Sequence, residues 1–169
     1  VILQADNPDG DSLASALALE AILADMGKNP LLVCGIDMPA HLKYLSGWDR
    51  VEKDLPQKFD ASIIVDASTL GLFETLDKNG QLGWIKSKPV LVLDHHMTST
   101  GIDYADVSII NEAVATGEII YDLAKDQDLP LSLDAMNFVA VSIMSDSLGL
   151  TSEGTTVNAI RIIADIVEA

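Results

Sequence analysis

The sequence predicts an α/β fold: a parallel, mostly five-stranded sheet with helices on both faces, followed by a mainly helical C-terminal part. Short runs rich in Val and Ile alternate along the chain with longer segments of helical periodicity, which is typical of β-α-β units. The runs are almost continuously apolar instead of alternating with polar residues. This pattern indicates strands that are buried on both faces of a parallel sheet and joined by right-handed crossovers.

The individual elements follow from these two patterns. The predicted strands are residues 1–5, 31–35, 61–66, 90–94 and 107–110. Apolar residues that recur every three or four positions predict the helices, and the first helix has Asp11 near its cap and Gly27 at its end. The predicted helices are residues 12–27, 39–45, 70–77, 116–125, 132–145 and 155–169, of which 39–45 has the weakest pattern.

Composition limits the classes of function. The 169 residues fit one domain with a large core, and the hydrophobic content of 49% excludes intrinsic disorder. Lys and Arg total 10 against 26 Asp and Glu, so the formal charge of −16 disfavours long nucleic acids and anionic membranes and favours cations. A single cysteine, Cys34, excludes an internal disulfide framework and a cysteine-built zinc site. No apolar run is long enough for a membrane span and no basic leader is present, so we expect a cytoplasmic protein.

Acidic and imidazole side chains follow three of the predicted strands and one predicted helix. In open α/β sheets, ligands bind beyond the carboxyl ends of the strands. Each of these residues also has a structural interpretation, because an aspartate after a strand often caps the next helix. The adjacent histidines are the hardest to explain in that way, whereas His41 lies in a weak pattern and is expected to be simply exposed. The residues at this edge are Asp9, Asp11, Asp66, Asp94, His95, His96 and Asp146.

Five aspartates cannot converge while ionised unless a cation or protonation relieves their repulsion. Mixed carboxylate and imidazole ligands suit Mn²⁺, with Mg²⁺, Fe²⁺, Co²⁺ or Zn²⁺ as alternatives. A carboxylate that bridges two such cations can support the activation of water for phosphoryl transfer.

Four stretches resemble the signature of the DHH phosphoesterase superfamily. This superfamily includes RecJ-like single-strand exonucleases, nanoRNA and dinucleotide phosphodiesterases, family II inorganic pyrophosphatases and an exopolyphosphatase. The first stretch, residues 5–15, reads Ala-Asp-Asn-Pro-Asp-Gly-Asp-Ser-Leu-Ala-Ser, and the others are Asp66 in Ile-Ile-Val-Asp-Ala-Ser, Asp94-His95-His96 and Ser145-Asp146-Ser147. The turn at residues 115–121 is also similar to the family's pattern.

The resemblance implies a hydrolytic site with two metal ions and a role for each matched residue. Asp66 would bridge the two ions, Asp94 would orient an imidazole, and His96 would donate a hydrogen bond to the developing charge on the phosphate. The implied metal ligands are Asp9 for the first ion and Asp11, His95 and Asp146 for the second, with Asp66 shared. The implied substrate contacts are Asn7, Ser68 and Thr116.

Two departures from the family pattern bear on activity. The histidine that usually begins the first motif is replaced by Ala5, which cannot ligate a metal, so we expect a weakened or rebuilt first site with Asp6 or Gln4 as a substitute ligand. No Gly-Gly-Gly-His motif occurs either, and we expect that residues 1–169 form only the DHH catalytic domain, without the C-terminal substrate-binding domain.

The favoured hypothesis is a metal-dependent phosphodiesterase that hydrolyses short oligoribonucleotides or linear dinucleotides to nucleoside monophosphates. It rests on Gly10, where the related pyrophosphatases usually carry threonine. One alternative is a pyrophosphatase or polyphosphatase, and another is a nucleotide-binding or regulatory module that Ala5 has deprived of turnover. The resemblance also allows a homodimer. No glycine-rich phosphate loop and no Gly-x-Ser-x-Gly motif support a different chemistry.

Overall fold

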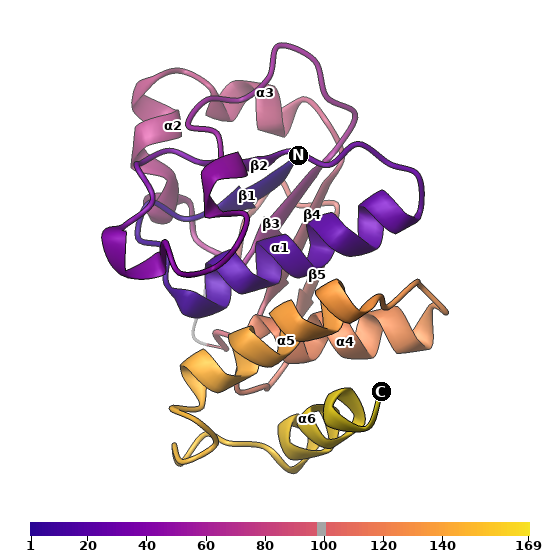
Figure 1. Ribbon diagram of the computed structural model, residues 1–169. Coiled ribbons are helices and arrows are strands. Elements are labelled where there is room, and N and C mark those ends of the chain that lie inside the picture. Colours follow the sequence, from indigo (N-terminus) through magenta and orange to yellow (C-terminus); the bar gives the residue numbers. More distant parts are fainter. Residues whose placement is uncertain (98–100) are drawn as a thin grey trace.

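The computed structural model describes residues 1–97 and 101–169 and contains a five-stranded, entirely parallel sheet (Figure 1). The strands are β1 (Ile2–Gln4), β2 (Leu32–Cys34), β3 (Ser62–Val65), β4 (Val90–Asp94) and β5 (Val107–Ile110). Their order across the sheet is β2-β1-β3-β4-β5, and each neighbouring pair is parallel. The α/β class and the five parallel strands are therefore confirmed.

The helices agree with the sequence prediction in the longer segments and differ in the short ones. The α-helices are α1 (Gly10–Asp25), α2 (Glu74–Lys78), α3 (Leu82–Lys86), α4 (Thr116–Asp126), α5 (Leu133–Asp146) and α6 (Val157–Glu168). The 3₁₀ segments are η1 (Ala40–Leu42), η2 (Trp48–Arg50) and η3 (Leu70–Phe73). Among the described residues, no helix has both the length and the apolar character that a membrane span requires.

Two predicted helices were wrong in detail, and one helix was not predicted. The segment 39–45 contains only η1, and a left-handed Gly47 with φ of 102° separates it from η2. The segment 70–77 divides into η3 and the short α2. Helix α3 has five residues, which is too short for helical periodicity to stand out in the sequence.

Helices cover both faces of the sheet, as the sequence predicts. Alternate side chains of β1 and β3 enter different apolar clusters: Ile2 and Val65 pack with α1, α4 and α5, whereas Leu3 and Ile64 pack with η3, α2 and α3. Helix α6 lies outside α4 and α5 and extends the first cluster (Figure 1). The predicted mainly helical C-terminal part therefore forms one side of the molecule.

The strand order places a crevice at the carboxyl end of the sheet. After β1 the chain moves to β2 on one side, and it then returns to β3 on the other side of β1. A crevice opens where such a reversal occurs in a doubly wound sheet. A cavity of about 330 Å³ lies there, and its lining includes Ala5, Asn7, Asp9, Asp66, Ser68 and His96.

Candidate metal centre

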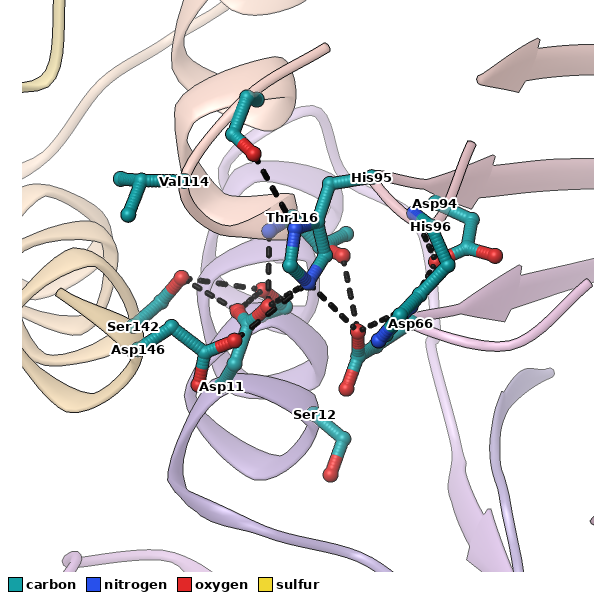
Figure 2. A network of polar contacts seen from close by, with 12 residues as sticks. Asp11, Ser12, Asp66, Asp94, His95, His96, Val114, Thr116, Ser142 and Asp146 are labelled. Carbon is teal, nitrogen blue, oxygen red and sulfur yellow. Dashed lines mark hydrogen bonds and ion pairs between the residues drawn. The ribbon is translucent and has the colours of Figure 1, made fainter. Parts of the chain in front are cut away.

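Three carboxylates surround one ring nitrogen of His95. Its Nε2 lies 3.4 Å from Oδ2 of Asp146, 3.5 Å from Oδ1 of Asp66 and 3.6 Å from Oδ2 of Asp11 (Figure 2). These residues come from α5, from the loop after β3, from α1 and from the loop after β4, so they are far apart in the sequence. The structure thus brings together four of the five residues expected to bind metal.

Asp11 is fully buried, and three donors hold its carboxylate. Ser15 and Ser142 donate their hydroxyls to Oδ1 at 2.8 and 2.5 Å, and the backbone N–H of Thr116 donates to Oδ2 at 2.8 Å. Burial raises the pKa of Asp11 in spite of these donors. The carboxylate is therefore fixed in position, and a cation would stabilise its charge.

Asp66 occupies a left-handed backbone conformation at the end of β3. Its φ of 53° is one that aspartate tolerates better than most residues. The hydroxyl of Thr116 donates to Oδ1 at 3.3 Å. Burial, followed by the charges of Asp11 and Asp9, raises the pKa of Asp66 to about 7. The turn therefore aims a carboxylate of unusually high proton affinity at His95.

The His95 ring is oriented by a backbone carbonyl. Its Nδ1 lies 3.2 Å from the oxygen of Ala113, and because a carbonyl only accepts, Nδ1 carries the proton. Nε2 is buried and makes no hydrogen bond of good geometry to any residue that the structure describes. Burial alone lowers the pKa of His95, but contact with Asp146 and Asp66 and the charge of Asp11 outweigh it and raise the pKa to about 11.

His96 is held by Asp94 at the edge of the crevice. Its Nδ1 donates to Oδ1 of Asp94 at 2.7 Å and lies 3.5 Å from Oδ1 of Asp66. Asp94 is fully buried, and it also accepts from the hydroxyl of Ser68 and from the backbone N–H of His96. The imidazole that Asp94 orients is therefore that of His96, whose side chain is about half exposed.

The donor set fits a divalent cation. Two groups, Asp11-His95-Asp146 and Asp66-His95-His96, each offer three ligand atoms that lie within 4.8 Å of one another. His95, whose buried Nε2 has no good hydrogen bond within the described part of the chain, belongs to both groups. Carboxylate oxygen with imidazole nitrogen is a ligand combination that suits Mn²⁺, Co²⁺ or Mg²⁺.

The remaining first-motif residues lie differently from the expectation. Asp9, not Asp11, caps α1, because Oδ1 of Asp9 accepts the N–H of Ser12 and the Ser12 hydroxyl accepts the N–H of Asp9. Asp9 lines the crevice but is in neither of the two groups of ligand atoms. Asp6 accepts the N–H of Thr75 at 2.7 Å, so its carboxylate is engaged with α2 and not with the group around His95.

Thr116 was expected to contact substrate, but it is fully buried and absent from the lining of the crevice. It lies behind the site because the first turn of α4 packs against α1, where its N–H and hydroxyl reach Asp11 and Asp66. Asn7 and Ser68 do line the crevice. Ser15 and Ser142 were not predicted from the sequence, although each is four positions from a predicted ligand on the same helix, a spacing that places side chains on one face.

Comparisons with known proteins identify a family and structures of similar fold. The family model described as the DHH family, N-terminal domain, matches residues 1–143. An exopolyphosphatase-related protein from Bacteroides fragilis has a similar structure, with a TM-score of 0.83 at 19% identity over 99% of this chain and 51% of that one. A Methanococcus jannaschii protein proposed to be a family II inorganic pyrophosphatase has a similar structure with a TM-score of 0.71. The two are 19% identical over 99% of this chain and 55% of that one.

These two structures are about twice as long as the present chain, and at this level of identity they show a shared fold. Among curated protein sequences, none matches the chain.

Proposed function

Because this chain belongs to the DHH family, we propose that it is the catalytic domain of a metal-dependent phosphodiesterase acting on short oligoribonucleotides or linear dinucleotides. The observation that carries this proposal is the convergence of Asp11, Asp66 and Asp146 on Nε2 of His95. The products would be nucleoside monophosphates. A small substrate suits a chain with a formal charge of −16, because affinity for long polymers depends on many Lys and Arg contacts to phosphate.

The residues of the site have separate tasks in this reaction. Asp9, Asp11, Asp66, His95 and Asp146 would hold the divalent cations, which we propose to be Mn²⁺, with Mg²⁺ or Co²⁺ as alternatives. Such ions, when bound, polarise a phosphoryl oxygen and lower the pKa of water. His96, fixed by Asp94 at the edge of the crevice, would donate a hydrogen bond to the phosphate as negative charge develops.

The first of the two metal positions is proposed to be the weaker one. Ala5 lines the crevice where the family pattern has a histidine, and Asp9 is partly engaged as the cap of α1. We also propose that residues outside this domain supply the cationic side chains that bind the substrate phosphates, since the solved structures of similar fold are about twice as long as this chain.

A pyrophosphatase or polyphosphatase is the second candidate. The names of the two similar structures support it, whereas Gly10 in the first motif favours the phosphodiesterase. A nucleotide-binding module without turnover is the third, and its support is Ala5.

A substrate comparison in the presence of Mn²⁺ tests these assignments. The 169-residue chain should release AMP from the 5′-phosphorylated diadenylate faster than it releases phosphate from pyrophosphate or polyphosphate, as measured by chromatography and a phosphate assay. Faster release from pyrophosphate or polyphosphate would instead select the second candidate. Binding of the dinucleotide in calorimetry, with no hydrolysis under Mn²⁺, Mg²⁺ or Co²⁺, would select the third.

Cation binding is expected to release protons. Metal-free His95, with a pKa of about 11, carries a proton at pH 8, but imidazole must be neutral on Nε2 to bind a metal. The affinity for Mn²⁺ should therefore rise by about tenfold per pH unit at pH 8, and more steeply below pH 7, where Asp66 is also protonated. Titrations in two buffers of different ionisation enthalpy measure the protons released, and identical binding heats in both would contradict this prediction.

A further inference from the structure

The orientation of His95 depends on one peptide unit. The carbonyl of Ala113 accepts the proton of Nδ1, which leaves Nε2 facing the three carboxylates (Figure 2). The N–H of the same peptide unit belongs to Val114. Since a trans peptide is planar, with its C=O and N–H pointing in opposite directions, any group that holds the Val114 N–H also sets the direction of the Ala113 carbonyl.

Glu118 holds that N–H. Its Oε2 accepts from Val114 at 3.0 Å, and the Glu118 side chain lies in the first turn of α4, where the residue is only 3% exposed. The same turn positions Thr116, whose N–H donates to Asp11 and whose hydroxyl donates to Asp66. A hydrogen bond from the N–H to a carboxylate also makes the carbonyl of that peptide a stronger acceptor.

Thr156 forms a hydrogen bond with the side chain of Glu118. The hydroxyl of Thr156 donates to Oε1 of Glu118 at 2.8 Å and accepts the N–H of Ala159 as the cap of α6. Both carboxylate oxygens therefore have a donor, one from the loop that orients His95 and one from the start of the last helix. This chain of contacts joins α6, which lies beyond the residues that the family model matches, to the candidate metal centre.

We propose that Glu118 is a positioning residue for His95 and that Thr156 secures it, so that the docking of α6 sets the metal affinity of the site. The inference deepens the proposed function and rests on it, because it takes His95 to be a metal ligand. Groups that orient a ligating histidine through its second nitrogen commonly change metal affinity by about 10- to 100-fold when they are removed.

Isothermal titration with MnCl₂ on the 169-residue chain tests the proposal. Thr156→Val removes the hydroxyl with little change in volume, and we expect it to weaken Mn²⁺ binding by about tenfold. Thr156→Ser keeps the hydroxyl and should bind as the unmodified chain does. Glu118→Gln replaces one of the two accepting oxygens with an NH₂ group and should weaken binding by roughly 10- to 100-fold. Melting curves without metal verify that each variant folds.

A matched control comes from a second contact between the same helices. Nδ2 of Asn158 on α6 donates to Oδ2 of Asp122 on α4 at 2.8 Å, in an exposed hydrogen bond that involves neither Glu118 nor Val114. Asn158→Ala should leave Mn²⁺ affinity unchanged. In the chain loaded with Zn²⁺, the His95 Nδ1–H resonance should be protected from solvent exchange, and Thr156→Val should speed its exchange while Asn158→Ala should not.

Mn²⁺ affinities of Thr156→Val and Glu118→Gln within about twofold of the unmodified chain would overturn the proposal. An equal loss in Asn158→Ala would overturn it as well, because the effect would then come from helix packing in general. Failure of the unmodified chain to bind Mn²⁺ would instead contradict the proposed function, and with it the premise of this inference.

Discussion

Asp66→Asn is expected to lower phosphoester hydrolysis by at least about a hundredfold while raising the melting temperature of the metal-free chain at pH 8. Under the proposed function, activity falls because a metal-binding carboxylate is lost, and the loss of a group that only supports a metal ligand already costs about 10- to 100-fold. Stability rises because burial raises the pKa of Asp66 to about 7 in spite of its contact with His95, so the ionised carboxylate at pH 8 destabilises the folded chain. Asparagine tolerates the φ of 53° that this turn requires.

The sign of the stability effect follows from linkage. A raised pKa in the folded state stabilises the fold at low pH, and that contribution disappears as pH rises through about 7. The gain from Asp66→Asn should therefore be larger at pH 8 than at pH 5. Asp25→Asn, an exposed change at the end of α1, is the control and should alter neither activity nor melting. A variant that retains activity under saturating Mn²⁺ would argue against the metal centre.

Gly117→Ala is expected to destabilise the fold by about 2–3 kcal/mol, which is roughly 5–10 °C in melting temperature for a chain of this size. An added Cβ would lie 2.2 Å from Oγ and 2.7 Å from Cβ of Ser142, within the contact between α4 and α5. Ser142 cannot move away without losing its bonds to Asp11 and to the Gly117 N–H. We therefore expect weaker Mn²⁺ binding in the same variant.

Gly83→Ala provides the matched control for this change. Apart from its own helix, no described residue has an atom within 4 Å of a Cβ added at Gly83, which is in helix α3 and has an ordinary backbone conformation. Alanine is a better helix former than glycine by about 1 kcal/mol, so this variant should melt at the same temperature or higher. Circular dichroism melting curves compare the Gly117→Ala and Gly83→Ala variants. An unchanged melting temperature for Gly117→Ala would contradict the prediction, because it would show that α4 and α5 can move apart without a loss of folding free energy.

Much of the fold could be predicted because burial on both faces leaves a local trace in the sequence. Predicted strand 90–94 coincides with β4, in which four apolar residues are followed by a buried aspartate. Predicted strand 107–110 coincides with β5, but β5 lies at the edge of the sheet and its side chains are exposed or half-buried, so the expected burial on both faces was wrong there. The long helices were equally clear from periodicity. Segments without a repeat of that kind, such as α3, left no comparable signal. The cap of α1 was misplaced by two residues because aspartates at 9 and 11 are both suitable and packing selects between them.

By itself, the sequence determined the class of fold, the edge of the sheet that carries the site and the residue types available for binding a cation. It did so because hydrophobic periodicity and the positions of strand ends are local properties of the chain. The tertiary structure decided the order of the strands and which side chains meet. It selected Asp11, Asp66 and Asp146 to surround His95, turned Asp6 toward α2 and placed Thr116 and Glu118 behind the site. Distances between residues on different elements depend on how whole helices pack against the sheet, and no single segment contains that information.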